Sequence, residues 1–189
     1  MGVRIRQWPW FAIMTRSGSE KSATLLLENA GYECFYPVSR FTRKKSDQME
    51  EIVEVPLFPG YFFCRINPHN RLPVLTTPGV TQIVGTGVTP IPVDEEEIAA
   101  IRRAGRSGLP VMPWPHVETG RVIRLADGPL AGLTGIVVKL KARMKLVLSV
   151  SLLRRSVAVE INCRWLGDTG SVQHALNSVQ QGVMESPEQ

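Results

Sequence analysis

Four short runs in the C-terminal third of the chain alternate between apolar and polar residues, which is the clearest pattern in the sequence. Ile123 and Leu125 share one face of the first run, and the same two-residue period recurs over residues 136–141, 145–150 and 156–161. Alternation of this kind predicts strands with one apolar face each, and four such strands in a short span predict a small all-β barrel.

The segment between the first two runs, residues 127–135, contains three glycines and a proline. Glycine can adopt positive φ and proline fixes its own φ, so this segment is predicted to be an exposed loop. The leucine-rich run at residues 140–155 could also form a helix. Alternation and the abundance of valine favour the barrel over this helix.

The N-terminal half of the chain begins with a strand pattern followed by a helix pattern. Residues 10–15 predict a strand, and a capping box from Ser17 to Glu20 predicts the start of a helix that ends near Gly31. The apolar face of this helix consists of residues at helical spacing, namely Ala23, Leu26, Leu27 and Ala30.

Further strands are predicted near residues 33–38, 51–57 and 61–66, with a charged segment from Arg40 to Glu54 between the first two. A final helix is predicted to begin at Asp94 and to stop at Gly105 and Gly108. This order predicts an α+β domain in which helices flank a mostly antiparallel sheet.

The strand predicted over Tyr61 to Ile66 has two apolar faces. Tyr61 and Phe63 lie on one face, and Phe62, Cys64 and Ile66 lie on the other. One face must line the core beneath the helices. The other must be covered by other parts of the molecule or remain as an exposed hydrophobic patch.

The chain is predicted to contain two domains. Residues 8–106 form the α+β domain, residues 107–118 are rich in proline and form a linker, and residues 119–166 form the barrel. The last segment, residues 167–189, loses its periodicity and is predicted to be disordered.

The net charge of +5 is concentrated in the predicted barrel. Residues 119–166 contain nine Lys or Arg and two Asp or Glu, so the remainder of the chain is slightly acidic. Clustered cations suit RNA or a ribosomal surface, because they neutralise phosphates. A solvated strand face accounts for the same charge equally well.

Nothing in the sequence indicates an enzyme, a metal site or a cofactor. The histidines His69, His116 and His174 have no metal-ligand spacing, and neither a nucleophile elbow nor a phosphate-binding glycine loop occurs. The odd number of cysteines and the absence of a CxxC motif argue against a disulfide framework and a zinc site. Cys34, Cys64 and Cys163 are therefore expected to be small core or strand residues.

The sequence gives no sign of membrane insertion or secretion. No apolar run reaches the roughly 18 residues that span a bilayer, and the N-terminus lacks a signal-peptide core. A cytoplasmic location is expected.

The barrel segment resembles a known motif. Residues 123–125, 128–132 and 135–137, which read IRL, GPLAG and GIV, are similar to the KOW motif of ribosomal proteins and of transcription elongation factors of the NusG family. Residues 10–13, 57–63 and 77–80, which read WFAI, LFPGYFF and TPGV, resemble in the same order the signature segments of the NusG N-terminal domain. The resemblance covers residues 8–166 and implies an SH3-like KOW barrel.

This resemblance implies RNA polymerase as the partner of the N-terminal domain, through the clamp helices of its largest subunit. The residues to which it assigns this contact are Trp10, Phe58, Pro59, Tyr61 and Phe63. The alternative is that these residues belong to the core.

The resemblance also implies a position beside the upstream DNA fork, where basic side chains could touch the non-template strand. The candidates are Arg16 and Lys21 at the start of the first helix and Arg43, Lys44 and Lys45 in the loop after the second strand. A solvated charge run explains these residues as well.

The KOW domain is expected to bind a second partner, either a small-subunit ribosomal protein or the Rho termination factor. Leu130 and Leu133 in the glycine-rich loop are the candidate anchors, unless Leu130 tucks back onto the barrel.

The function that the resemblance implies is transcription elongation or antitermination, with suppression of pausing or termination by binding rather than by chemistry. Residues 33–63 look closer to specialised antiterminator paralogues than to the housekeeping factor. The alternative is a ribosome-associated or RNA-binding KOW protein.

Overall fold

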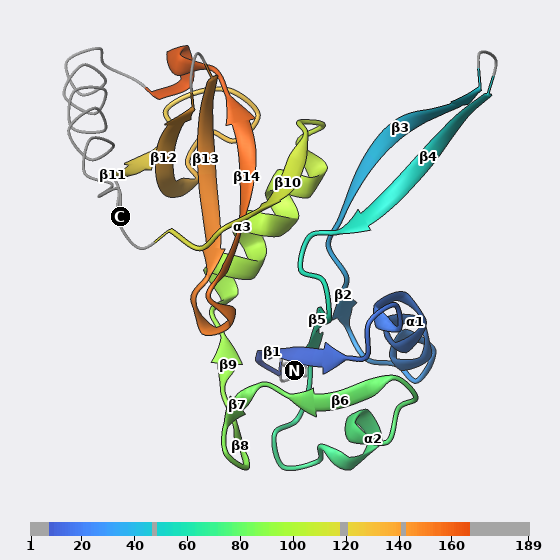
Figure 1. Ribbon diagram of the computed structural model, residues 1–189. Helices are drawn as coiled ribbons and strands as arrows, with labels where there is room; N and C mark the ends of the chain where they lie inside the picture. The colour runs from blue at the N-terminus through green and yellow to red at the C-terminus, as the bar shows by residue number, and fades with distance from the viewer. Residues whose placement is uncertain (1–7, 47–48, 118–120, 141–142, 167–189) are drawn as a thin grey trace, which may run out of the picture. The chain divides into compact units, whose positions relative to one another are not determined.

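The computed structural model describes residues 8–46, 49–117, 121–140 and 143–166 of the chain (Figure 1). The described residues divide into two compact units. The first comprises the residues up to Ala99 together with Val150–Leu153, and the second comprises Ala100–Ser149 and the described residues after Leu153. The tail expected to be disordered, residues 167–189, lies outside the described residues.

The first unit is built on an antiparallel sheet in the order β2-β5-β1-β6, and β9 also pairs with β1. Its elements in chain order are β1 (Trp10–Thr15), α1 (Glu20–Asn29), β2 (Cys34–Phe35), β3 (Val38–Ser46), β4 (Met49–Pro56), β5 (Tyr61–Arg65), α2 (Leu72–Leu75), β6 (Val80–Ile83), β7 (Gly85–Thr86), β8 (Thr89–Pro90) and β9 (Pro92–Val93). The third helix, α3 (Glu95–Arg106), starts in this unit and continues into the second. The mixed α and β composition with antiparallel pairing confirms that part of the predicted fold class.

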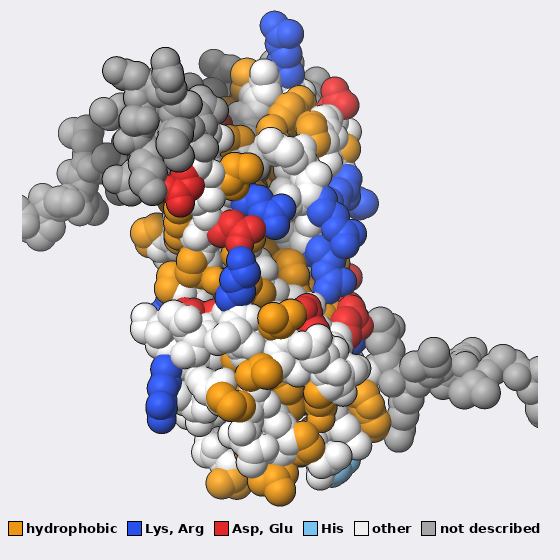
Figure 2. All heavy atoms as spheres, turned by 90° about the vertical axis from the view of Figure 1, so that its right-hand side faces the viewer, with side chains coloured by type: hydrophobic (Ala, Val, Ile, Leu, Met, Phe, Trp, Pro, Cys, Tyr) orange, Lys and Arg blue, Asp and Glu red, His pale blue; other side chains and the backbone are white. Residues whose placement is uncertain are grey.

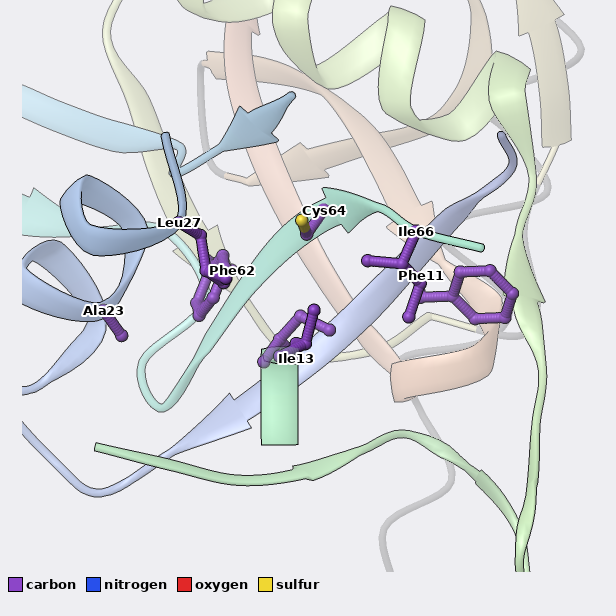
Figure 3. Packing of buried hydrophobic residues seen from close by; sticks show 8 residues of the cluster. Phe11, Ile13, Ala23, Leu27, Phe62, Cys64 and Ile66 are labelled. Atoms are coloured by element: carbon purple, nitrogen blue, oxygen red, sulfur yellow. The ribbon is translucent and has the colours of Figure 1, made fainter. Parts of the chain in front are cut away.

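The core of the first unit lies on one face of the β1–β5 pair. Phe11 and Ile13 of β1 and Phe62 of β5 are at most 2% exposed. In Figure 3, Leu27 of α1 lies beside Phe62, and Phe11 lies beside Ile66 at the other end of the cluster. Alternate residues of each strand reach this face, because side chains along a strand point to opposite sides. The strands predicted at residues 10–15 and 61–66 are therefore confirmed.

Helix α1 differs from its prediction in its cap and in its buried face. The helix begins at Glu20 after Ser19, without a side-chain capping bond, so the capping box predicted from Ser17 is wrong. Leu26 is 46% exposed instead of belonging to the apolar face. The buried stripe also contains Glu20 and Thr24, and the Glu20 carboxylate accepts a hydrogen bond from the Gly60 N–H at 2.8 Å.

Strands β3 and β4 form a long two-stranded hairpin that extends away from the sheet containing β1 and β5 (Figure 1). The strand predicted near residues 51–57 corresponds to β4, but the cations at residues 43–45, predicted to lie in a loop, belong to β3. The register sets Arg40 opposite Glu54 and Phe41 opposite Val53. Cross-strand pairs of opposite charge and of β-branched or aromatic residues stabilise such a ribbon without a core beneath it.

The second unit contains one sheet in the order β10-β14-β13-β12-β11. Its strands are β10 (Val111–Trp114), β11 (Arg121–Arg124), β12 (Thr134–Leu140), β13 (Arg143–Val150) and β14 (Arg155–Ile161), and the short helices η1 (Ser151–Leu153) and η2 (Cys163–Leu166) flank β14. The four runs of alternating residues are strands, and the helical alternative for residues 140–155 is not adopted over β13. The closure of this sheet into a KOW barrel stays a prediction.

The linker expected over residues 107–118 is partly regular structure. Residues 111–114 form β10, and Val111 pairs with Val159 and Met112 with Ala158 of β14. Val111 is buried. The prolines suggested an irregular linker, but proline is compatible with an edge strand such as β10, where one side of the backbone needs no partner strand.

The core assignment predicts a large loss of stability from Phe62→Ala. Phe62 is fully buried against α1, so its truncation should lower the free energy of unfolding by about 3–5 kcal/mol in a denaturant titration. Ile52→Ala, at a side chain 70% exposed on β4, is the control and should change it by about 0.5 kcal/mol or less. Similar losses for the two variants would contradict the core assignment.

Candidate functional site

The second face of the β1–β5 pair is aromatic. The register places Trp10 opposite Arg65, Ala12 opposite Phe63, and Met14 opposite Tyr61, all on the face away from α1. The ring of Phe63 stacks on Phe35 with centroids 6.1 Å apart and meets the ring of Phe58 edge-on at 5.5 Å. Both geometries are favourable for aromatic pairs.

Most of this aromatic face has no exposed surface. Trp10, Phe58 and Phe63 are at most 1% exposed, so the expectation that their side of β5 forms an exposed patch is wrong for these three residues. They behave as core residues: Phe63 contacts the rings of Phe35 and Phe58, and the Arg65 guanidinium lies over the Trp10 ring. Their assignment to polymerase binding stays a prediction.

Arg65 is a buried cation that joins several elements of the first unit. Its guanidinium lies 4.6 Å from the centroid of the Trp10 ring, forms an ion pair with Glu33 at 3.0 Å and bonds to Glu95 at the start of α3. It also donates to the carbonyl of Trp8 at 2.7 Å. Buried arginine is tolerated when it is paired in this way, since the partners replace lost water.

The turn at Phe58-Pro59-Gly60-Tyr61 projects from the end of this face. The Tyr61 N–H donates to the Phe58 carbonyl at 2.9 Å, and Gly60 has φ of +85°. Proline at the second position and a positive-φ glycine at the third are typical of a type II turn. Pro59 is exposed and Tyr61 half-buried, so these two are the accessible members of the predicted polymerase-binding set.

Two further hydrogen bonds fix the turn to the rest of the unit. The Gly60 N–H donates to Oε1 of Glu20 at 2.8 Å, and the Gly60 carbonyl accepts from the Thr15 N–H at 2.9 Å. Glu20 is buried at the start of α1, and Thr15 ends β1. The turn therefore has a fixed conformation before any partner binds, which lowers the ordering cost of binding.

The predicted nucleic-acid contacts lie in three places. Arg16 and Lys21 are exposed on either side of the start of α1, and the Lys21 ammonium bonds to Glu54 at 3.0 Å. Arg43, Lys44 and Lys45 belong to β3 and not to a loop, so their predicted location is wrong. The β3–β4 register sets Arg43 opposite Glu51 and Lys44 opposite Glu50, which places an acidic residue across from each of these two cations.

Figure 2 shows Lys and Arg side chains interspersed with hydrophobic and acidic ones on one face of the molecule. The pattern in this view is mixed and not uniformly positive. In the first unit, Glu54 pairs with both Lys21 and Arg40, at 3.0 and 2.9 Å. These hydrogen bonds hold the pKa of the Glu54 carboxyl below its ordinary value.

The loop of the second unit is folded back on itself. Leu130 is completely buried, and Leu133 is half-buried. The Leu125 N–H donates to the Leu133 carbonyl at 2.9 Å, and the Gly132 N–H donates to the Leu125 carbonyl at 2.7 Å. Leu130 as an exposed anchor is therefore wrong, since the loop closes over it, and Leu133 is the more accessible of the two candidates.

Neither a metal-binding cluster nor a membrane-spanning helix is found in the described residues. Among them, no group of three or more His, Cys, Asp or Glu side chains could hold a metal ion. Within the described part of the chain, no helix has both the length and the apolar character needed to cross a membrane.

Sequence reasoning missed the residues that support the turn and the aromatic face. The contacts that hold these parts join residues far apart in the sequence. Glu20 bonds to Gly60 of the turn, and Arg65 bonds to Glu95. Arg65 alone gave a local signal, because it is a single charge within an otherwise apolar strand.

Comparison with known proteins gives consistent matches. Residues 9–102 match the family model described as "Transcription termination factor nusG". The "Transcription termination/antitermination protein NusG" of Helicobacter pylori (strain J99) is 28% identical over 164 residues, which cover 80% of this chain and 93% of that protein. The protein of the same name from Thermus thermophilus is 28% identical over 173 residues, covering 81% and 94%.

A solved structure shares the fold. The structure described as "Domain interaction in Thermotoga maritima NusG" aligns with a TM-score of 0.50 at 21% identity, over 80% of this chain and 92% of that one. At this identity the likeness concerns the fold alone.

The turn geometry predicts that Gly60→Ala is destabilising although the site has space for a methyl group. A Cβ at Gly60 would meet no atom within 4 Å, so the cost comes from the positive φ and should be about 1–2 kcal/mol in denaturant unfolding. Gly105→Ala, inside α3 and equally open, is the control and should be neutral or stabilising. A neutral Gly60→Ala would contradict the assigned turn.

The ion pairs of Glu54 with Lys21 and Arg40 predict that part of the folding stability depends on pH. Because the pKa of Glu54 is lower in the folded protein than in the unfolded chain, its contribution to stability is present above the ordinary glutamate pKa and is lost as the pH falls through the lowered value. In an NMR titration of the side-chain carboxyl, Lys21→Met should raise the pKa of Glu54. Lys139→Met, a control in the second unit, should leave it unchanged, and an unchanged value in Lys21→Met would refute the pairing.

Proposed function

This chain belongs to the NusG family, and we propose that it binds RNA polymerase through the 58–61 turn beside the aromatic face of β1 and β5. It is a transcription elongation and antitermination factor. Its action is binding and not catalysis, and its place of action is the cytoplasm.

The observation that carries the polymerase-binding proposal is the accessible turn within the matched region. The family match over residues 9–102 includes β1, the turn and β5. Pro59 and Tyr61 are accessible, whereas Phe58 and Phe63 fix the turn from below. Pro59 and Tyr61 are rigid side chains, so they provide apolar contact area with little loss of side-chain entropy. Such a surface is suited to a helical partner, and the clamp helices of the largest polymerase subunit are the partner that we propose.

Binding of this kind affects elongation by population shift. We expect the protein to bind the closed, elongating conformation of the polymerase more tightly than the paused one. Saturating binding then shifts the equilibrium between the two conformations toward the closed one by the ratio of the two affinities. Pausing or termination is then suppressed without chemistry in the bound factor.

Contacts to the non-template DNA strand belong to the same proposal. Arg16 is exposed beside α1, and the hairpin strand β3 carries Arg43, Lys44 and Lys45. Because glutamates lie opposite two of these cations, DNA would meet individual side chains on the hairpin instead of a continuous positive surface.

The second unit is proposed to be a KOW module that recruits a second partner, a small-subunit ribosomal protein or Rho. The half-buried Leu133 is the proposed apolar contact, and the buried Leu130 keeps the loop closed around it. Direct binding of structured RNA or of the ribosome is the alternative function, which the basic excess of residues 119–166 favours.

The polymerase-binding proposal predicts that Tyr61→Ala weakens capture of RNA polymerase by the full-length chain about tenfold or more, as expected for a central aromatic contact. Biolayer interferometry with immobilised elongation complexes measures this, and melting curves verify that the variant is folded. Val88→Ala, at a residue 87% exposed in the β7–β8 turn, is the control and should bind like the unaltered protein.

Two results would contradict the proposal. Wild-type affinity in a folded Tyr61→Ala variant would remove the turn from the interface. A chain that binds structured RNA tightly and does not bind polymerase would establish the alternative function.

A further inference from the structure

Two cysteines face each other across neighbouring strands in the core of the first unit. Cys34 of β2 is the direct cross-strand partner of Cys64 of β5, and their sulfur atoms are 3.4 Å apart. Both thiols are free, and the residues are 30 positions apart in the sequence. Figure 3 shows the Cys64 sulfur atom on β5.

The backbone register suits a covalent bond between them. The Arg65 N–H donates to the Glu33 carbonyl at 2.9 Å, so Glu33 and Arg65 are a hydrogen-bonded pair of the antiparallel ladder. Such pairs alternate with non-hydrogen-bonded ones, in which the opposed Cα atoms are about 4.5 Å apart and the side chains are closest. Cys34 and Cys64 occupy the non-hydrogen-bonded position. That spacing falls within the Cα range of disulfides, about 4.4–6.8 Å.

The residues around Cys34 and Cys64 also favour a disulfide between them. Cys64 is fully buried in the apolar cluster with Phe62 and Ile66, and Cys34 packs against this cluster while remaining half-buried. A disulfide is less polar than two thiols and leaves no donor to be satisfied. The hydrogen bond with Cys34 and burial both raise the pKa of the Cys64 thiol. Cys34 is the half-buried and therefore more accessible member of the pair.

We propose that Cys34 and Cys64 are a redox-responsive pair that forms a reversible cross-strand disulfide when the protein meets a peroxide. Hydrogen peroxide first oxidises the accessible Cys34 sulfur to a sulfenic acid and is itself reduced to one water. The Cys64 sulfur then attacks the Cys34 sulfur, the S–S bond forms, the S–O bond breaks, and the hydroxyl group leaves as water with the Cys64 proton. A low-molecular-weight dithiol restores both thiols by exchange.

A disulfide between Cys34 and Cys64 would enclose residues 35–63 in a covalent loop. The segment between the two cysteines contains the β3–β4 hairpin and the 58–61 turn, and β2 contributes only two residues of strand pairing at its base. A covalent link at that base would limit the separation of β2 from β5. In a reducing cytoplasm a disulfide of this kind is a regulatory state instead of a permanent support. The proposal does not depend on polymerase binding and is tested on the protein alone.

The test uses the full-length chain with Cys163→Ser, which removes the exposed third thiol. After treatment with hydrogen peroxide and alkylation of remaining thiols, tryptic digestion should give a linked pair of peptides, residues 22–40 and 46–65, lighter than their sum by two hydrogen atoms. Dithiothreitol should separate them. The melting temperature of the oxidised protein should rise by about 5–10 °C, because the link constrains the unfolded chain.

The control is Cys34→Ala in the same background, at the half-buried member of the pair, which should abolish both the linked peptides and the temperature shift. The proposal is overturned if both peptides are recovered as separate alkylated thiols at peroxide doses that oxidise Cys163 in the unaltered chain. It is also overturned if Cys34 stops at a sulfinic acid, or if the linked peptides form only in urea.

Discussion

The antiparallel pairing of β1 with β5 is the constraint on which the first unit depends. Side chains along each strand alternate between the two faces of the sheet. The register that sets Trp10 opposite Arg65 therefore determines which residues of β1 and β5 lie on each face. Phe62 meets Leu27 of α1 on one face, and Phe63 meets Phe35 and Phe58 on the other. A slip of one residue would place the Arg65 charge on the face that packs into the core.

The aromatic face has a different role from that of an exposed binding patch. Phe58 and Phe63 are buried, and their contact sets the position of the turn that follows Leu57. Bonds from Glu20 and Thr15 to Gly60 then tie the turn to α1 and β1. A fully buried residue has no surface left for a partner. The buried residues therefore hold the turn in place, and Pro59 and Tyr61 are the residues that a partner could contact.

The sequence predicts the parts of this fold in which local pattern and tertiary environment agree. Alternation located the four strands at the C-terminal end to within a few residues, and short apolar runs located β1 and β5. It failed where distant partners decide. The charges at residues 43–45 suggested a loop, but these residues belong to β3 and pair with β4 across a hairpin. The glycines around Leu130 left two positions open for it, an exposed anchor or a buried side chain, and the structure shows it buried. The second face of β5 is buried as well, and one of the rings that contacts Phe63 there, Phe35, comes from the distant strand β2, so the residues of β5 alone could not reveal this.

The short strand β2 links these observations. It joins the sheet through two residues, and both side chains are used: Phe35 stacks on Phe63 on the aromatic face, and Cys34 meets Cys64 on the core face. A two-residue strand contributes few ladder bonds, so its side chains contribute a large share of its attachment. Because the hairpin and the turn lie between β2 and β5 in the chain, the strength of this attachment limits how far both can move relative to the sheet. The chemistry of the Cys34–Cys64 pair therefore acts at the position where the geometry of the proposed binding surface is set.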